Sequence, residues 1–270
     1  MPWWKRQVVD GKAKMILLQT KNDTLYWQLQ DPKAGNSIGT SMMSQLVQAL
    51  RELKARLRSD KAPRVLVVSA SPTNGLWIAG GNLRELALLT AIEVRRYAQT
   101  MARLCVELTR LPIPVLVAVD GKAIGGGVEL ALAGDLILAT KASSFHFKQL
   151  DVGLSLGYGS TQRLVQSVGL SRARHWVLGR SLISADQALD AGLVSEVVAD
   201  STALSERVAA LAQELEAIDP FLLATQKKML YLGHERTVKL DLASEQKGFL
   251  AVWGNPQHRK FLADFHSRSE

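Results

Sequence analysis

The chain has almost no cysteine. Its 270 residues include a single one, Cys105, so an intrachain disulfide and a cysteine-based zinc cluster are both excluded. The five histidines, at positions 146, 175, 234, 258 and 266, show no metal-ligand spacing. We therefore expect no metal site. Because Cys105 falls on the apolar face of a predicted helix, we expect it to be a core residue.

Long apolar runs are also missing. No stretch approaches the roughly 20 apolar residues that a membrane-spanning helix needs. Residues 1–6 are not followed by the apolar region of a secretory signal. No proline- or serine-rich linker and no low-complexity tract divides the chain. These absences predict one compact protein that works in the cytoplasm and does not contact a membrane.

Hydrophobic residues, at 47%, are abundant enough for a sizeable core, and charged residues make up 21%. The net charge is +8, and the sequence pI is about 9.7. Such a basic balance suits nucleic acid or a small ligand that carries several phosphates. The basic residues are scattered, without a dense block or interleaved aromatic residues, so the sequence favours the phosphorylated small molecule.

Hydrophobic periodicity predicts an α/β domain. Alternating runs on either side of residues 21–24 predict a β-hairpin, and helical spacing follows over 43–57 and 94–108. Buried strands are predicted at 64–70, 115–119, 135–140 and 144–147, and the chain beyond residue 161 has a mainly helical pattern. The order β, β, α recurs, with a glycine turn at matching places in two successive units. One α/β domain with a helical C-terminal third is the simplest arrangement.

The chain is organised around three consecutive glycines, Gly125, Gly126 and Gly127. They follow a predicted buried strand and precede a predicted helix, so backbone N–H groups can approach a ligand there without an intervening Cβ. Glu129 stands four residues after Gly125. Anion-binding amides beside one acid–base group are the parts needed to enolise a carbonyl compound. Taken alone, such a run is more often a flexible loop.

Four segments match known motifs in the same order along the chain. They are Ala79-Gly-Gly-Asn-Leu83, Gly121-Lys-Ala-Ile-Gly-Gly-Gly-Val-Glu-Leu-Ala131, Gly159-Ser-Thr-Gln-Arg-Leu164 and Ile183-Ser-Ala-Asp-Gln-Ala-Leu-Asp-Ala-Gly-Leu-Val194. With a final helical stretch, residues 245–265, the matches cover nearly the full length. On these motifs the chain resembles the crotonase superfamily, the enoyl-CoA hydratase/isomerase family.

The resemblance implies a crotonase-like α/β fold, a spiral of ββα units. We expect this spiral in residues 1–195 and a helical trimerisation region, part of the same functional unit, in residues 196–270. A homotrimer, often paired into a hexamer, is implied. An apolar strip that fits such an interface consists of Phe249, Leu250, Val252, Trp253, Phe261 and Phe265.

The resemblance also implies the ligand and its contacts. The ligand is an acyl-CoA thioester, and no cofactor is expected beyond the coenzyme A of the substrate. The backbone N–H groups of Gly81 and Gly126 hold the thioester oxygen, and Glu129 is the acid–base group. The substrate-binding positions carried over are Ala79, Gly125 and Tyr158.

One position departs from the family pattern. The hydratases use a second carboxylate, in a motif Phe-x-x-Pro-Glu, and the segment that begins here at Phe145 has Gln149 in the acid's place. Gln149 can hold a water or a substrate oxygen, but it cannot transfer a proton at neutral pH. Whether Asp151 replaces the missing acid stays open. Asn82 likewise stands where the first turn usually has aspartate.

The sequence therefore predicts an enzyme that stabilises a thioester enolate, with Glu129 and Gln149 as its catalytic positions. One carboxylate suffices for double-bond isomerisation, and hydration by a water held on Gln149 is the close alternative. Hydrolysis or decarboxylation on the same scaffold, and a largely non-catalytic acyl-CoA- or RNA-binding role, are further alternatives. The acyl group and the pathway stay open.

Overall fold

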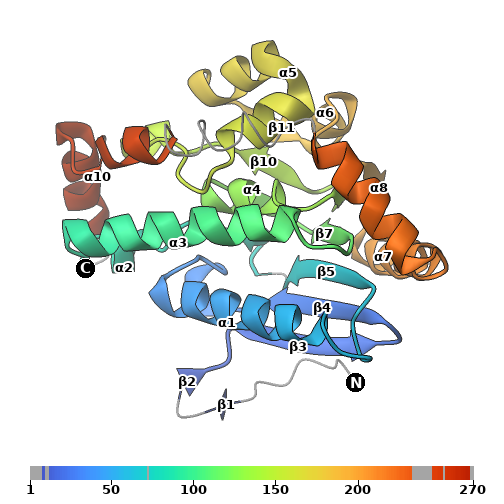
Figure 1. Cartoon of the computed structure of the whole chain (residues 1–270). Coiled ribbons are helices and arrows are strands. Elements are labelled where there is room, and N and C mark those ends of the chain that lie inside the picture. Colours follow the sequence, from blue (N-terminus) through green and yellow to red (C-terminus); the bar gives the residue numbers. More distant parts are fainter. Residues whose placement is uncertain (1–7, 10–11, 72, 233–244, 252, 268–270) are drawn as a thin grey trace.

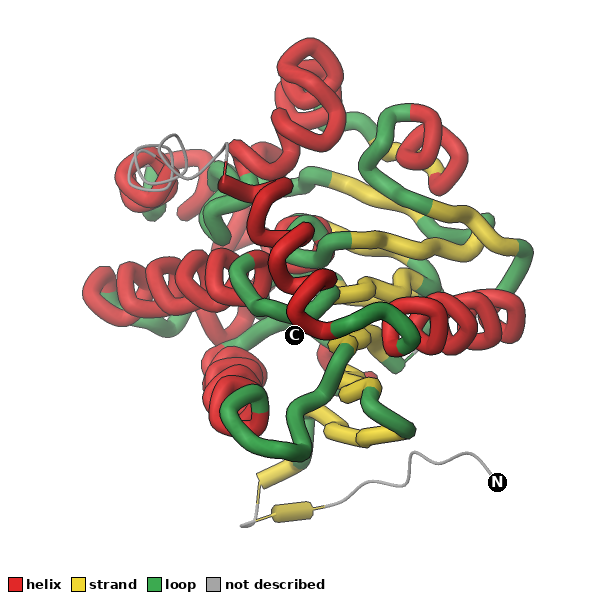
Figure 2. The backbone as a smooth tube through the Cα atoms, turned by 45° about the vertical axis from the view of Figure 1, so that its right-hand side comes forward, coloured by secondary structure: helices red, strands yellow, loops and turns green. Residues whose placement is uncertain are grey.

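The computed structural model describes residues 8–9, 12–71, 73–232, 245–251 and 253–267. Two main sheets run through the middle of the molecule, and helices surround them (Figures 1 and 2). A short antiparallel ribbon of β1 (Val8–Val9) and β2 (Lys12–Ala13) precedes them.

The larger sheet has six strands in the order β12-β9-β7-β5-β4-β3. The pair β3–β4 is the predicted antiparallel hairpin, and every other neighbouring pair is parallel. The strands are β3 (Ile16–Lys21), β4 (Thr24–Leu29), β5 (Val65–Ala70), β7 (Val115–Val119), β9 (Leu136–Thr140) and β12 (Glu196–Val198).

The smaller sheet has four strands in the order β11-β10-β8-β6. β6, β8 and β10 are parallel, and β11 runs antiparallel to β10. The strands are β6 (Leu76–Ile78), β8 (Lys122–Ile124), β10 (Ser144–His146) and β11 (Leu182–Ser184).

Successive strands alternate between the two sheets. β5, β7 and β9 lie in the larger sheet, and the strands that follow them, β6, β8 and β10, lie in the smaller one. This repeated step confirms the predicted spiral of ββα units. Because β6 and β8 are neighbours, with Ile78 opposite Ala123, the glycine turns that follow these two strands come together.

Helices follow the strand pairs and then dominate the second half of the chain. They are α1 (Thr40–Arg56), α2 (Leu83–Leu86), α3 (Ala91–Thr109), α4 (Gly126–Ala131), α5 (Thr161–Leu178), α6 (Ala185–Asp190), α7 (Ser201–Glu216), α8 (Pro220–Leu232) and α10 (Pro256–Ser267). Two 3₁₀ turns, η1 (Pro32–Ala34) and η2 (Leu150–Val152), and a helical stretch over 245–251 complete them. α3 begins at a capping box of Thr90 and Glu93 and ends before Pro112.

The larger sheet is covered on both faces, as parallel strands require. Along β5, Val65 and Val67 belong to a cluster that packs against α7, while Leu66 and Val68 belong to the main core. Alternation along the strand sends successive side chains to opposite faces. The main core therefore lies on the α1 and α3 side of the sheet, where it also supports the glycine turns.

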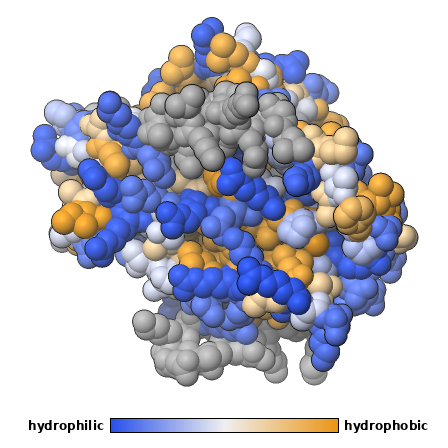
Figure 3. All heavy atoms as spheres, viewed as in Figure 1, coloured by the Kyte–Doolittle hydropathy of each residue, from blue (hydrophilic) through white to orange (hydrophobic). Residues whose placement is uncertain are grey.

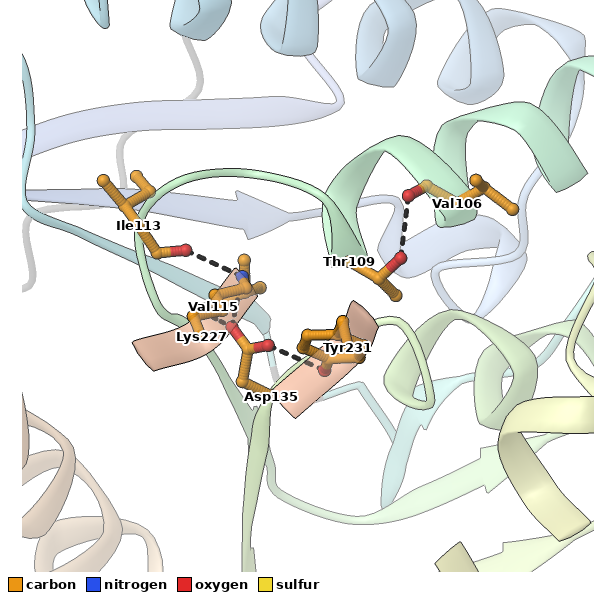
Figure 4. A network of polar contacts seen from close by, with 7 residues as sticks. All are labelled: Val106, Thr109, Ile113, Val115, Asp135, Lys227 and Tyr231. Carbon is orange, nitrogen blue, oxygen red and sulfur yellow. Dashed lines mark hydrogen bonds and ion pairs between the residues drawn. The ribbon is translucent and has the colours of Figure 1, made fainter. Parts of the chain in front are cut away.

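Helix α8 is fastened to the sheet by a buried ion pair (Figure 4). The Asp135 carboxylate accepts hydrogen bonds from Lys227 Nζ at 2.6 Å, from the Tyr231 hydroxyl at 2.8 Å and from the Val115 amide at 2.7 Å. Lys227 Nζ also donates to the Ile113 carbonyl at 2.8 Å. Burial lowers the Lys227 pKa, and the Asp135 charge opposes that shift.

The chain beyond residue 161 is mainly helical, as expected, and the three-residue strands β11 and β12 lie among its helices. One expectation from the sequence needs correction. The expected apolar strip is not an exposed face, because its members Phe249, Trp253 and Phe261 line a cavity. Val252 lies outside the described residues, and so does the side chain of Phe265.

Candidate active site

The two glycine turns are in direct contact. Gly80 has a φ of +93°, in the region that favours glycine, and a Cβ there would lie 2.8 Å from the Ile124 carbonyl oxygen. The same Cβ would lie 3.2 Å from the amide nitrogen of Gly126. Gly125 has a φ of +52° and stands at the N-cap position, directly before α4. Only residues without side chains let the turns approach this closely.

Each turn leaves at least one glycine amide N–H without a partner among the described residues. In the first turn, the Ile38 amide donates to the Gly80 carbonyl, and the Asn82 amide donates to the Ile38 carbonyl. These two bonds flank Gly81 and leave its own N–H unpaired. In the second, Gly126 is the first residue of α4 and has no acceptor within its helix. The free donors include the N–H groups of Gly81 and Gly126, the two residues that the sequence predicts as the oxyanion hole.

Glu129 lies at the centre of the site and is 2% exposed. Its Oε2 accepts three hydrogen bonds, from the amides of Gly157 at 3.0 Å and Tyr158 at 2.8 Å and from the Ser160 hydroxyl at 2.6 Å. Its Oε1 accepts one, from Gln149 Nε2 at 2.8 Å. Oε2 is thus turned into the protein, and Oε1 keeps capacity for a further partner.

The surroundings of Glu129 raise its pKa to about 7. Burial is the main cause, and the negative charge of Glu245 is the second. The hydrogen bonds from Ser160, Tyr158 and Gln149 oppose this shift, because they favour the charged form. A carboxyl group whose pKa lies near neutrality can both accept and return a proton.

Gln149 combines burial with an unused acceptor. It is 7% exposed, and its Oε1 has no hydrogen-bond partner among the described residues. A buried carbonyl oxygen without a partner is costly, and it is often satisfied by a ligand or a water. Gln149 Oε1 therefore offers an acceptor beside Oε1 of Glu129.

Two tyrosines, Tyr97 and Tyr158, lie next to the glycine turns. The Tyr97 hydroxyl donates to the Ile38 carbonyl at 2.7 Å and is hydrogen-bonded to the Tyr158 hydroxyl. A Cβ on Gly126 would lie 2.9 Å from the Tyr158 hydroxyl. Burial raises the pKa of both phenols, so both stay protonated at neutral pH.

The two glycine turns, Glu129, Gln149 and both tyrosines border one cavity of about 500 Å³. The predicted positions Ala79, Gly81, Gly125, Gly126, Glu129, Gln149 and Tyr158 all line it. The C-terminal part of the chain contributes Phe249, Trp253 and Phe261 to the lining. The cavity thus combines aromatic side chains with the glycine amides and the carboxylate.

Asp151 and Asn82 have other partners than the Glu129 carboxylate in the described structure. Asp151 lines the cavity, but its carboxylate lies 3.3 Å from Arg180 Nη1 and 3.9 Å from His146 Nε2, and no hydrogen bond joins it to Glu129 in the described structure. Asn82 caps α2 by accepting a hydrogen bond from the Glu85 amide at 3.3 Å. Its role in the described structure is to start a helix.

Among the described residues, no group of three or more histidine, cysteine, aspartate or glutamate side chains is arranged to hold a metal ion. In the same part of the chain, every helix is too short or too polar to cross a membrane.

The site can be compared with those of known proteins. A sequence profile described as enoyl-CoA hydratase/isomerase matches residues 19–267. The chain belongs to the enoyl-CoA hydratase/isomerase family. It is thus an enzyme of the type that acts on acyl-CoA thioesters, and the family resemblance predicted from its four motifs is confirmed.

Curated relatives agree with this assignment. The chain is 34% identical over 218 residues to the mouse "Enoyl-CoA hydratase domain-containing protein 2, mitochondrial", covering 80% of this chain and 72% of the relative. It is also 34% identical over 211 residues to "Enoyl-CoA isomerase/hydratase fer4" of Mycosarcoma maydis, covering 76% of each.

Solved structures confirm the crotonase fold of this family member. An enoyl-CoA hydratase/isomerase from Xanthobacter autotrophicus superposes with a TM-score of 0.85 at 23% identity, covering 94% of this chain and 93% of that one. An enoyl-CoA hydratase from Bacillus halodurans superposes with a TM-score of 0.84 at 20% identity, covering 93% and 100%.

Sequence reasoning missed three residues of this site. Ser160 was visible only as part of a motif, and Tyr97 only as one apolar position of a predicted helix. Glu245 lies 85 positions beyond Ser160, yet its carboxylate accepts hydrogen bonds from the amides of Ser160 and Thr161. No spacing rule connects Glu245 to this site, so the sequence carried no signal for it.

Proposed function

We propose that the protein moves the double bond of an enoyl-CoA thioester by way of an enolate. The N–H groups of Gly81 and Gly126 hold the thioester oxygen, and Glu129 transfers the proton. Donors aimed at the oxygen where negative charge develops lower the barrier to proton removal from the adjacent carbon.

The proton balance needs one carboxylate. Ionised Glu129 takes a proton from the α-carbon of a 3-enoyl thioester, and the electron pair of that C–H bond moves to the thioester oxygen, which gives a dienolate. The neutral carboxyl group then returns the proton to another carbon of the same system, and the thioester carbonyl re-forms. Oε1 is the working oxygen, because Oε2 already accepts three hydrogen bonds.

A single observation carries this proposal. Glu129 is buried, has a pKa of about 7 and shares one cavity with two glycine amides that lack a partner in the described structure. The residue at the usual position of a second acid, Gln149, cannot exchange protons. The site thus contains one acid–base group beside an anion-binding pair.

Hydration is the second candidate, and it rests on Gln149. Its unpartnered Oε1 and Oε1 of Glu129 together offer two acceptors for one water molecule. Glu129 would then accept the proton of that water while the water oxygen attacks the β-carbon, and the neutral carboxyl group would return this proton to the α-carbon of the resulting enolate. Gln149 would only orient the water.

The cofactor requirement and the cellular compartment are further parts of the proposal. We propose that coenzyme A enters only as part of the substrate, that the protein needs no other cofactor, and that it works in the cytoplasm. Its net charge of +8 suits a ligand with several phosphates.

The experiment is a panel of 2-enoyl-, 3-enoyl- and 3-hydroxyacyl-CoA thioesters in D₂O, followed by chromatography and mass spectrometry. Isomerisation should give a new isomer, which carries deuterium only to the extent that the proton on Glu129 exchanges with solvent, whereas hydration adds the mass of D₂O. Glu129→Gln should lose about 10²–10⁴-fold in rate. If the wild type neither exchanges deuterium into any thioester nor converts one, the proposed chemistry is wrong.

A further inference from the structure

We propose that Glu245, from the C-terminal part of the chain, is a positioning residue for Glu129. It anchors the loop that holds the Glu129 carboxylate and supplies the second negative charge of the site. This inference rests on the proposed function, because it takes Glu129 as the acid–base group.

The Glu245 carboxylate caps helix α5. Its Oε1 accepts a hydrogen bond from the Ser160 amide at 3.1 Å, and its Oε2 accepts one from the Thr161 amide at 2.7 Å. These amides open an 18-residue helix, where donors lack partners and negative charge is favoured. Ser160 stands at the capping position, but its own side chain makes no capping hydrogen bond.

The Ser160 side chain does not cap its helix because its hydroxyl is hydrogen-bonded to Glu129 instead. The hydroxyl donates to Oε2 of Glu129 at 2.6 Å, and Ser160 is fully buried. Glu245 thus takes over the capping that Ser160 would otherwise perform. One serine joins the two carboxylates, with its backbone bound to Glu245 and its side chain to Glu129.

The same helical stretch, residues 245–251, also contacts Gly157, at the other end of the loop 157–160 that holds the Glu129 carboxylate. Phe249, one helical turn beyond Glu245, packs so closely on Gly157 that a Cβ there would lie 2.7 Å from the phenyl ring. The Gly157 amide donates to Oε2 of Glu129 at 3.0 Å. Residues 245–251 therefore support two of the three hydrogen-bond donors to Oε2.

Electrostatics gives Glu245 a second role, because its charge disfavours the ionised form of Glu129. The other titratable groups that interact with Glu129 are the phenols of Tyr97 and Tyr158 and the thiol of Cys105, all neutral because burial raises their pKa values.

Three charged side chains also lie in this region. Lys148 and Asp151 line the cavity, and the charge of Arg163, on α5, lowers the pKa of Cys105 against the effect of burial. Glu245 is absent from the lining of the cavity, so it acts through its neighbours and does not touch the substrate.

The two roles predict opposite pH effects, which makes them separable. Loss of the charge in Glu245→Gln or Glu245→Ala should lower the pKa of Glu129. Loss of the hydrogen bond in Ser160→Ala should raise it. If Glu245 were only a cap, its removal would loosen Ser160 and shift the pKa in the same direction as Ser160→Ala.

The experiment follows Glu129 by NMR in full-length protein labelled with ¹³C at the glutamate carboxyl carbon, and the signal is assigned by its loss in Glu129→Gln. The wild type should titrate near pH 7. Both Glu245 variants should titrate at lower pH, Ser160→Ala at higher pH, and the exposed control Glu206→Gln as the wild type. The acid limb of kcat/KM should move in parallel.

The two Glu245 variants keep the test decisive. Gln can still accept one amide hydrogen bond and Ala cannot, yet both lack the charge, so both must lower the midpoint. A midpoint that stays or rises in Glu245→Gln overturns the inference. The titration needs no turnover: if the midpoints move as expected while no thioester reacts, the role of Glu245 holds and the proposed reaction fails.

Discussion

At the level of individual residues, the two oxygens of Glu129 have different tasks. Three donors fix Oε2, so the carboxylate cannot rotate freely, and Oε1 faces Gln149 with acceptor capacity to spare. A carboxylate held in this way is oriented before any substrate binds, which is how active sites avoid reorganisation during the reaction. Gln149 is part of this arrangement as a donor and not as an acid.

This arrangement predicts unequal effects at the two positions. Glu129→Gln should remove most turnover while the variant still binds acyl-CoA. Gln149→Ala should cost less, because it removes one hydrogen bond and an orienting group but no proton transfer. Gln149→Glu should raise hydration of crotonyl-CoA relative to isomerisation, since it restores a second acid, and it should also raise the pKa of Glu129 by charge repulsion.

Rates of both reactions across pH in the wild type and these three variants check the prediction. Acyl-CoA binding to Glu129→Gln, measured by calorimetry, is the control for intact structure. Efficient hydration by the wild type that Gln149→Glu does not improve would show that the missing acid is irrelevant, and the single-acid mechanism would have to be abandoned.

The sequence predicted part of this site because its motifs are local. Gly126 and Glu129 are three positions apart, and Gly81 and Gly126 occupy equivalent places in successive ββα units, so their meeting follows from the repeat. Glu245 reaches the site only through tertiary packing. Its contribution depends on where the C-terminal helices fold back, and no local pattern encodes that.

At the level of secondary-structure elements, long elements were predictable, but among the three-residue strands β10 was predicted while β8, β11 and β12 were not. The hairpin, α1, α3, β5, β7 and β9 agree with the periodicity of their residues. β8, β11 and β12 have three residues each, too few for an alternating pattern to appear. β8 also lies between Gly121 and Gly125, and these glycines favour the prediction of a turn over that of a strand. Such strands form because neighbouring strands offer hydrogen-bond partners.

Helix α8 depends on Asp135, and this dependence gives an element-level prediction. Asp135→Ala would leave the Lys227 ammonium buried without its counter-ion and would remove the acceptor of Tyr231. Breaking a buried pair in this way typically costs about 3–5 kcal/mol. We expect a loss of that size in the free energy of unfolding, measured by urea denaturation.

The matched control is Glu214→Ala, which removes an exposed partner of Arg207. An exposed pair contributes about 0–1 kcal/mol, so this variant should unfold almost as the wild type does. Equal losses in the two variants would mean that the contacts of Asp135 do not fasten α8.

At the level of the whole molecule, the C-terminal part of the chain returns to the spiral that precedes it. Phe249, Trp253 and Phe261 wall the cavity, and Glu245 anchors the loop beneath Glu129. The division at residue 195 that the sequence suggested therefore separates segments that share one site. These three aromatic side chains do not form an exposed face, and the exposed apolar residues that could serve an interface lie elsewhere.

Helix α8 exposes such residues, and we propose that it lies at a subunit interface. Hydrophobic side chains gather along the right-hand side of the molecule, where α8 runs (Figures 1 and 3). Its exposed members are Phe221, Leu222, Met229 and Leu230, with exposed fractions of 81%, 59%, 61% and 67%. Large apolar side chains grouped on one face usually mark an interaction site.

The resulting prediction is that the wild type sediments as a multiple of three chains at micromolar concentration. The double variant Leu222→Asp, Leu230→Asp should sediment as smaller species, because assembly would bury two carboxylates in an apolar contact. Leu178→Asp, at a leucine of α5 that is 68% exposed, is the matched control and should assemble as the wild type does. A wild-type monomer would refute the assembly itself. A trimer that survives both α8 substitutions would place the interface elsewhere, and the exposed face of α8 would then need another partner.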